Sequence, residues 1–384
     1  MKILIITDGI YPFVIGGMQK HSYYLAKNLA EAGHQITLIH CIASTKNIPS
    51  KEDLRAEFGA DAMKNLKIIG LKFPAPSWYP GHYLKESYAY SKSVFATVRN
   101  QLNEFDFIYA KGFTAWSFLE KKKGGMKMPP IGIKFHGYEM FQTPANFKSR
   151  LHNYLLKGPT LWNNKNADFI FSYGGKITDI IQRIGVGDEK ILEIPTGIEQ
   201  SWCLEKPASL AEKKIRFAFV GRFERRKGVE ELSAALKILT PDFDFQFEFI
   251  GPIPPSAKIS SNKIRYHGSK SDKKEIQNIL DTCQVLVVPS HSEGMPNVIM
   301  EGMARGLAIL ATDVGAVRSV VNEENGWFVE PGDTKALTQL LQMIIQSDPK
   351  EIQARQKSSC TRIHSFHWSK IAEITASKIS KCLR

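Results

Sequence analysis

The chain alternates short, continuous apolar runs with stretches whose apolar residues recur at helical spacing. Residues 2–7 (KILIIT) and 35–40 (QITLIH) are such runs, as expected of strands that are covered on both faces. Between them, residues 21–34 (HSYYLAKNLAEAGH) have helical spacing and reach Gly33, which suits the end of a helix. A strand, a helix and a strand in this order form a βαβ unit, which predicts a parallel sheet.

This alternation occurs in two separate series along the 384 residues. The first series has further expected strands at residues 67–71, 105–110, 131–136 and 169–173. The second series has expected strands at residues 215–221, 245–251, 264–268, 284–290 and 307–313. Two series predict an α/β protein of two Rossmann-like, doubly wound domains, because a chain of this length exceeds one ordinary core. We expect one domain at residues 1–200 plus a returning C-terminal helix at 365–384, and the other at 201–364.

Composition narrows the class of protein. The net charge of +13 favours an anionic partner, such as a nucleotide, a polyphosphate, nucleic acid or a lipid surface. The five cysteines include no C-x-x-C pair, so neither a disulfide framework nor a zinc site is expected. No apolar run is long enough for a membrane span, and the N-terminus lacks the pattern of a signal peptide. These features predict a cytoplasmic protein whose contact with a membrane is at most peripheral.

Two clusters of polar residues follow expected strands of the second series. Open parallel sheets bind ligands beyond the carboxyl ends of their strands, so the cleft between two such domains is the expected site. The first cluster, residues 292–301 (SEGMPNVIME), begins a helix in which Pro296 suits the first turn. A helix N-terminus offers N–H donors and a favourable dipole to a phosphate. Glu301 is expected to accept the hydroxyls of a ribose, and Glu293 to hold a sugar hydroxyl.

The alternative for both glutamates is a simple interaction with the helix dipole, although an unpaired carboxylate in an apolar stretch would be costly. The second cluster, residues 221–228 (GRFERRKG), places four cations before a helix, where positive charge is unfavourable unless an anion offsets it. Arg222 offers a planar fork and Lys227 a point charge, which together suit a diphosphate. Arg225 and Arg226 are equally consistent with a solvated basic loop.

Seven motifs occur in order along the chain, at residues 16–39, 135–137, 221–228, 249–251, 266–268, 292–306 and 311–316. In order and spacing they resemble the family 4 retaining glycosyltransferases of GT-B fold. The pair Glu293 and Glu301 matches the E-x7-E element of that family. The resemblance covers almost the whole chain and is weakest over residues 45–130 and 140–165.

The resemblance implies roles for residues at matching positions. The implied catalytic residues, which lie near the anomeric carbon, the diphosphate and a sugar hydroxyl, are His136, Arg222, Lys227 and Glu293. The implied donor-binding residues are Gly16, Gly17, Gly268, Ser269, Gly294, Met295, Asn297 and Glu301. Many relatives have a phenylalanine-glycine pair where this chain has Met295 and Pro296. Because proline donates no backbone hydrogen bond, the sequence leaves the identity of the donor sugar open.

The family implies transfer with retention, by same-face attack and without an enzyme nucleophile. It implies a nucleotide diphosphate sugar as a substrate, with no cofactor and no required metal. Residues 242–244 (DFD) spell the D-x-D metal signature of a different glycosyltransferase fold, but they precede an expected strand. They therefore lie at its amino end, away from the expected cleft, and we interpret them as a solvated turn. The pair Gly16 and Gly17 lacks the G-x-G-x-x-G spacing of a dinucleotide site.

The acceptor is the least constrained part of the prediction. Residues 150–157 (RLHNYLLK) have the pattern of a basic amphipathic helix, which would suit an anionic membrane and a lipid-linked acceptor. A core helix with solvated lysines is an equally good interpretation. No nucleic-acid recognition motif is present, so nucleic acid is not an expected partner. The expected location is the cytoplasm, either away from the membrane or on its inner face.

The sequence thus predicts a retaining glycosyltransferase that moves a sugar from a nucleotide diphosphate donor to a glycan, lipid-linked or small-molecule acceptor. The resemblance points to cell-surface polysaccharide or glycoconjugate synthesis. A nucleotide-sugar epimerase of the same fold, which needs no acceptor, is one alternative. A catalytically inactive sugar-nucleotide binding module is another, and a peripheral membrane scaffold is a third.

Overall fold

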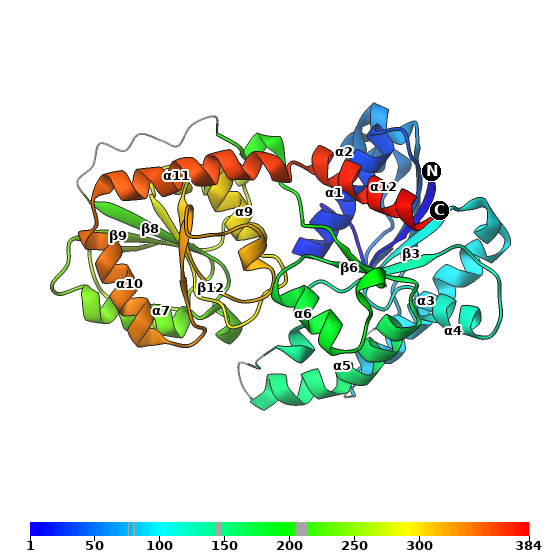
Figure 1. Ribbon diagram of the computed structural model, residues 1–384, viewed down its shortest axis with the longest axis horizontal. Helices are drawn as coiled ribbons and strands as arrows, with labels where there is room; N and C mark the ends of the chain where they lie inside the picture. Colours follow the sequence, from blue (N-terminus) through cyan, green and yellow to red (C-terminus); the bar gives the residue numbers. More distant parts are fainter. Residues whose placement is uncertain (76, 80, 143, 145–146, 205–213, 384) are drawn as a thin grey trace. The chain divides into compact units, whose positions relative to one another are not determined.

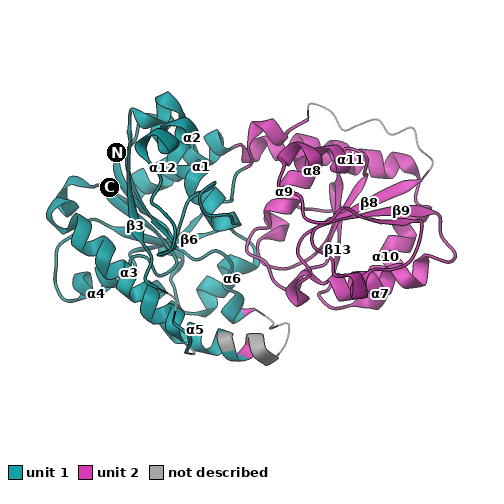
Figure 2. Ribbon diagram, turned by 180° about the vertical axis from the view of Figure 1, so that it is seen from behind, with its two compact units in different colours: residues 1–141, 151–197, 368–384 teal, residues 142–150, 198–367 magenta. Residues whose placement is uncertain are grey.

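The computed structural model describes residues 1–75, 77–79, 81–142, 144, 147–204 and 214–383. The chain forms two compact units, which Figure 2 colours separately. Unit 1 comprises Met1–Phe141, Leu151–Gly197 and Trp368–Arg384. Unit 2 comprises Gln142–Arg150 and Ile198–His367. Apart from the short segment Gln142–Arg150, the chain therefore leaves unit 1 after Gly197 and returns to it at Trp368.

Unit 1 is built on a seven-stranded sheet in the order β3-β2-β1-β4-β5-β6-β7, in which every neighbouring pair is parallel. Its strands are β1 (Lys2–Ile6), β2 (Gln35–Ile42), β3 (Leu66–Lys72), β4 (Phe107–Lys111), β5 (Ile131–Lys134), β6 (Phe169–Ser172) and β7 (Ile191–Glu193). The order reverses between β1 and β4, which creates a switch point of the kind where doubly wound sheets bind ligands. The sequence did not predict β7, because its three residues form no apolar run.

The helices of unit 1 alternate with its strands in the sequence and lie beside the sheet (Figure 1). They are α1 (Gly17–Glu31), α2 (Lys51–Met63), α3 (His82–Val98), α4 (Trp116–Lys123), α5 (Phe147–Asn166), α6 (Lys176–Arg183) and α12 (Trp368–Cys382). The C-terminal helix α12 packs on α1, where the Trp368 ring lies 5.1 Å from His21 and 5.7 Å from Tyr24. Gly197 allows this packing, because a Cβ atom there would lie 2.5 Å from the Trp368 ring.

Unit 2 is built on a six-stranded parallel sheet in the order β10-β9-β8-β11-β12-β13. Its strands are β8 (Ile215–Val220), β9 (Phe245–Ile250), β10 (Ile264–Tyr266), β11 (Val285–Val288), β12 (Ala308–Thr312) and β13 (Gly326–Val329). Its helices are α7 (Val229–Leu239), α8 (Lys273–Leu280), α9 (Asn297–Ala304), α10 (Thr334–Gln346) and α11 (Pro349–Ile363). The prediction of two doubly wound α/β sheets is confirmed, although β13 was not among the expected strands.

The central strands form because they consist mainly of apolar residues that are buried on both faces. Residues Ile3–Ile6 of β1 and Val285–Val287 of β11 are fully buried. The helices then cover the sheets with one apolar stripe each, as with Leu232 and Leu236 on α7. The candidate site residues lie beyond the strand ends, on the loops and helices that follow.

Candidate active site

The loops that follow β8 and β11 meet in unit 2 at a buried carboxylate. Lys227 Nζ donates to Glu293 Oε1 at 2.5 Å, and Ser290 Oγ donates to the same oxygen at 2.8 Å. Arg226 Nη1 lies 3.7 Å from the other oxygen, Oε2. The Glu293 side chain is only 7% exposed. The structure therefore brings two of the predicted catalytic residues into contact, although 66 positions separate them in the sequence.

Glycines allow these loops to pack backbone against backbone. Gly228 has a φ of +67°, and a Cβ atom there would lie 1.9 Å from the Pro289 carbonyl oxygen. Gly315 has a φ of +56°, and a Cβ atom there would lie 2.2 Å from the Glu293 carbonyl oxygen. Any side chain at either position would meet both a strained backbone and a main-chain atom that cannot rotate away. The glycines thus position the loop that carries Glu293.

The other cations of the basic cluster have separate partners. Arg222 is 70% exposed, and its Nη2 lies 3.0 Å from Glu224 Oε1. Arg225 Nη1 donates to Glu231 Oε2 at 2.9 Å and lies 2.6 Å from His291 Nε2. The interpretation of Arg225 as a solvated loop residue is therefore wrong, because its guanidinium ties the loop to α7. Arg222 remains accessible to a ligand from solvent.

The helix α9 follows the Glu293 loop, as expected, with one difference at its start. The helix begins at Asn297, so Pro296 occupies the N-cap position rather than the first turn. Met295 is buried and Glu301, the fifth residue of α9, is partly buried. The Gly294 carbonyl accepts from the backbone N–H of Ala316 at 2.7 Å, which joins this loop to the one after β12.

The other two predicted donor-binding residues of unit 2, Gly268 and Ser269, follow β10. Gly268 has a φ of +70°, and a Cβ atom there would meet nothing within 4 Å, so open space adjoins it. Its carbonyl accepts from the Gly251 N–H at 2.9 Å, and Ser269 is exposed. Unit 2 thus carries Arg222, Lys227, Gly268, Ser269, Glu293, Gly294, Met295, Asn297 and Glu301.

Unit 1 carries the other three predicted residues at the carboxyl ends of its strands. Gly16 is the N-cap of α1 and Gly17 its first residue. His136 follows β5, and its Nδ1 lies 3.0 Å from the Tyr173 hydroxyl. The two rings meet edge to face at 5.4 Å. Because Tyr173 is buried, this contact fixes the orientation of the histidine ring.

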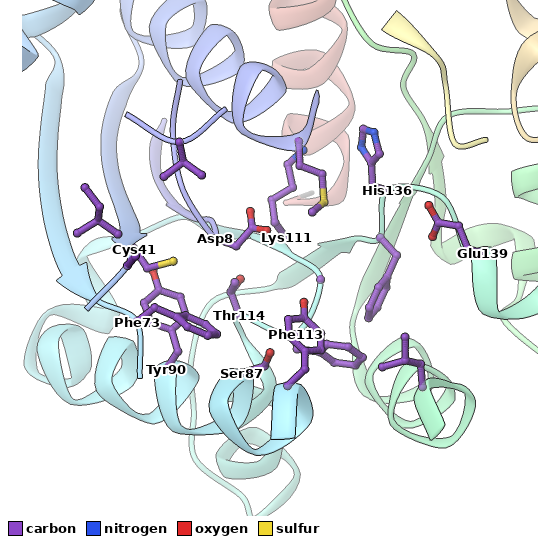
Figure 3. A pocket seen from close by; sticks show the side chains of 18 of the residues that line it. Asp8, Cys41, Phe73, Ser87, Tyr90, Lys111, Phe113, Thr114, His136 and Glu139 are labelled. Carbon is purple, nitrogen blue, oxygen red and sulfur yellow. The ribbon is translucent and has the colours of Figure 1, made fainter. Parts of the chain in front are cut away.

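A cavity of about 510 Å³ lies in unit 1 beside His136 (Figure 3). The residues that end strands and line the cavity include Asp8 after β1, Cys41 on β2, Phe73 after β3 and Lys111 on β4. Most of the lining is apolar. The polar side chains that line it are Asp8, Lys46, Ser87, Lys111, Thr114, His136 and Glu139.

Lys111 is the most unusual of these side chains. It is 2% exposed, and its Nζ has no hydrogen-bond partner among the described residues. Burial lowers the pKa of Lys111 to about 7, with the neighbouring Asp8 carboxylate opposing this effect. Burial likewise raises the pKa of Asp8 above its ordinary value, and the charge of Lys111 opposes that shift. Sequence reasoning missed both residues, although each lies at the end of a strand, where the same rule would have pointed to them.

The D-x-D triplet lies where the sequence predicted. Asp242 and Asp244 are exposed and immediately precede β9, at the amino end of the sheet, and Asp244 pairs with Lys214 at 2.9 Å. Within the described ranges, no group of three or more His, Cys, Asp or Glu side chains is arranged to hold a metal ion. In the same ranges, no helix combines the length and apolar character needed to cross a membrane.

Comparison with known proteins gives a separate family match for each half of the chain. The family model described as Glycosyltransferase Family 4 matches residues 15–202, and the one described as Glycosyl transferases group 1 matches residues 214–347. Over 301 residues the chain is 24% identical to the N,N'-diacetylbacillosaminyl-diphospho-undecaprenol alpha-1,3-N-acetylgalactosaminyltransferase of Campylobacter jejuni. That alignment covers 74% of this chain and 77% of the relative.

A second relative and a solved structure extend the comparison. Over 152 residues the chain is 28% identical to the capsular polysaccharide biosynthesis glycosyltransferase CapM of Staphylococcus aureus, covering 38% of this chain and 40% of CapM. The structure of Anabaena HepE in complex with UDP superimposes with a TM-score of 0.66. It covers 99% of this chain and 100% of HepE at 15% identity, a level at which the likeness shows the fold alone.

Proposed function

The chain belongs to the family 4 glycosyltransferases of GT-B fold, and from this premise we propose that unit 2 binds a nucleotide diphosphate sugar and unit 1 its acceptor. The observation that carries the proposal is the contact between Lys227 and Glu293 at 2.5 Å. Two motifs that are far apart in the sequence supply a cation for the diphosphate and a carboxylate for the sugar. Each is held in place by the strand ends and glycines of one sheet.

Transfer breaks the bond between the anomeric carbon and the β-phosphate oxygen and releases the nucleotide diphosphate. Negative charge develops on that phosphate while the sugar gains oxocarbenium character. Lys227, with Arg222 at the surface, supplies fixed positive charge where the leaving group becomes more negative, and such preorganised charge lowers the barrier. His136, whose ring is oriented by Tyr173, contacts the donor sugar in this proposal.

We infer that the configuration at the anomeric carbon is retained, without a covalent enzyme intermediate. The acceptor hydroxyl attacks the same face from which the phosphate leaves, and the departing phosphate accepts its proton. Retention through a covalent intermediate would need a carboxylate nucleophile. Glu293 is poorly suited to that role, because one of its oxygens already accepts from Lys227 and Ser290. The same cations make a metal ion unnecessary in this scheme.

The names of the relatives guide the choice of acceptor. One acts on a diphospho-undecaprenol-linked sugar, and the other belongs to capsular polysaccharide synthesis. We therefore propose a glycan or lipid-linked acceptor in cell-surface polysaccharide or glycoconjugate synthesis. An epimerase or an inactive binding module would need no second substrate site. The cavity beside His136 favours the transferase over both alternatives.

We expect one nucleoside diphosphate from a panel of UDP, GDP, ADP and dTDP to raise the melting temperature by about 5–10 °C at a concentration of roughly 100 times Kd. The shift should persist in EDTA, and the matching nucleoside should give none. With the donor that this base identifies, NMR of the product should show the anomeric configuration of the donor. Absence of any shift would contradict the proposed function. Loss of the shift in EDTA, or an inverted product, would contradict the metal-free, retaining scheme.

We also propose that α5 contacts an anionic membrane surface. Leu151 is 60% exposed and Tyr154 is 74% exposed, so the alternative interpretation of this segment as a core helix is wrong for these residues. The exposed Arg150 and Lys157 flank them. Apolar side chains beside basic ones are the pattern of a helix that lies in the membrane interface.

The α5 proposal predicts flotation of the protein with vesicles that contain phosphatidylglycerol. Leu151→Glu should weaken this association by about tenfold, because it removes a leucine that would be buried in lipid. Ile238→Glu is the matched control, since Ile238 is also 60% exposed but lies on α7 of unit 2. If the two variants float alike, α5 is not the contact surface.

A further inference from the structure

We propose that the cavity of unit 1 binds an acceptor that carries an anionic group beside a compact apolar group, and that Lys111 holds the anionic group. The inference rests on the proposed function and adds the chemistry of the acceptor to it. It follows from three observations on the described residues: two buried lysines on neighbouring strands, a lysine side chain without a hydrogen-bond partner, and an apolar cavity lined by that same lysine.

The positive charge comes from two lysines on neighbouring strands. Lys111 on β4 and Lys134 on β5 are partners in the parallel register, and both are almost completely buried. Two like charges this close destabilise a sheet unless other groups compensate them. Lys134 is compensated, because its Nζ donates to the Ile194 carbonyl at 2.9 Å and lies 3.7 Å from the centre of the Tyr173 ring.

Lys111 lacks such hydrogen-bond partners among the residues that the structure describes. Asp8 is the carboxylate beside it in Figure 3, and its charge interacts with that of Lys111. The other acidic residue of the cavity, Glu139, is remote from Lys111, since its carboxylate packs over Gly137, next to His136. Asp8 is therefore the cavity carboxylate that interacts with Lys111. Among the described residues, the Lys111 ammonium still has no hydrogen-bond partner.

His21 is a third buried basic side chain in this region. It is buried, and neither ring nitrogen has a hydrogen-bond partner among the described residues. Burial lowers the pKa of His21 well below its ordinary value, and the charges of Lys111 and Lys134 add to this effect. The histidine is thus kept neutral and offers no charge that could pair with Lys111. An anionic ligand would stabilise the charged form of Lys111, whose pKa burial lowers to about 7.

The rest of the cavity is suited to an apolar group of the ligand. Its apolar lining comes from the strand ends and from α1, α3 and α5, and includes Met18, Phe73, Tyr90, Phe113, Phe135 and Leu156. The volume of about 510 Å³ lies within the usual range of sites that bind small molecules. A bare sugar would lose the hydration of its hydroxyls against such walls, whereas an aryl or isoprenyl group would not. The ligand class is therefore an anionic amphiphile.

Two sources offer this chemistry, a phosphorylated aryl compound and an isoprenyl phosphate, and calorimetry on the full chain distinguishes them. Benzyl phosphate and geranyl phosphate are the probes, with benzyl alcohol, geraniol and inorganic phosphate as controls. We expect at least one phosphate ester to bind about tenfold or more tightly than both its alcohol and inorganic phosphate. The better ester identifies the source. Equal binding of ester and alcohol, or of ester and inorganic phosphate, would overturn the proposal.

Substitutions then test the role of Lys111. Lys111→Met should weaken binding of the better ester by at least about tenfold and leave binding of its alcohol unchanged. Lys46→Met is the matched control, because Lys46 also lines the cavity but is exposed. It should change the affinity for the ester by less than about twofold, as expected for a solvated charge. If Lys46→Met weakens binding as much as Lys111→Met, the anion is held at the surface and the proposal fails.

Two further measurements separate this inference from structural damage and from the proposed function. Ser87 is a buried side chain of the cavity wall, so Ser87→Leu should narrow the cavity and weaken binding of ester and alcohol alike. The thermal shift that a nucleoside diphosphate gives should be unchanged in Lys111→Met. A preserved nucleotide shift with no ester binding in the wild-type chain would refute only the present inference. A missing nucleotide shift would instead refute the proposed function.

Discussion

Replacing Lys227 by methionine is expected to lower kcat by about 10²–10³-fold, the usual loss when one preorganised group that stabilises developing charge is removed. The ammonium lies 2.5 Å from Glu293 Oε1 and its side chain is only 17% exposed, so water cannot easily replace it. The leaving diphosphate would lose its buried positive charge in the transition state. Steady-state kinetics with the identified donor measure the loss, and the nucleoside diphosphate should also give a smaller thermal shift.

The loss has to be distinguished from damage to the fold. Removing one partner of a buried ion pair costs about 3–5 kcal/mol when the other charge is left uncompensated. Glu293 would keep its hydrogen bond from Ser290 and the nearby Arg226, so we expect a smaller cost here. Combining Lys227→Met with Glu293→Gln removes both charges and should restore stability without restoring activity.

A matched control lies on the helix that follows. Lys237 is an exposed lysine on α7, and Lys237→Met should leave both kcat and the melting temperature unchanged. Recovery of activity in the Lys227→Met, Glu293→Gln double variant would show that the pair is structural. An unchanged kcat in Lys227→Met alone would remove this lysine from the reaction.

The architecture follows from the sequence wherever burial is uniform. Strands such as β1 and β11 consist of consecutive apolar residues, because helices cover both faces of the sheets. The two strands that were missed, β7 and β13, are short, and β7 is only partly buried. Neither produces a long apolar run, and their place at the sheet edges is a property of the assembled fold.

The candidate site was predictable to the extent that it depends on local position. Glu293 and Lys227 both follow strands, and the structure joins them because β8 and β11 are adjacent in the sheet. The contacts of Arg225 with Glu231 and His291 could not be predicted from the sequence, because they depend on how two loops approach each other. Lys111 was missed for a related reason, since a lysine in a sequence is normally a surface residue until the fold buries it.

The close approach of the loops in unit 2 predicts a large effect of a single methyl group at Gly228. Gly228→Ala should lower stability by about 3 kcal/mol, since alanine at a φ of +67° costs about 1–2 kcal/mol and overpacking adds about 1–3 kcal/mol. The added Cβ would lie 1.9 Å from the Pro289 carbonyl oxygen, so Pro289 and the neighbouring Ser290 would have to move. Calorimetry should show unfolding about 6–12 °C lower for a unit of this size.

Activity should fall with stability in Gly228→Ala, because displacement of Ser290 disturbs the carboxylate of Glu293 that it holds. Gly33→Ala provides the control, since Gly33 also has a positive φ, +86°, but a Cβ atom there would have nothing within 4 Å. Gly33→Ala should lower stability only by the backbone cost of about 1–2 kcal/mol and keep full activity. If Gly228→Ala melted no lower than Gly33→Ala, the loops would be able to separate without cost, and their packing could not be what positions Glu293 against Lys227.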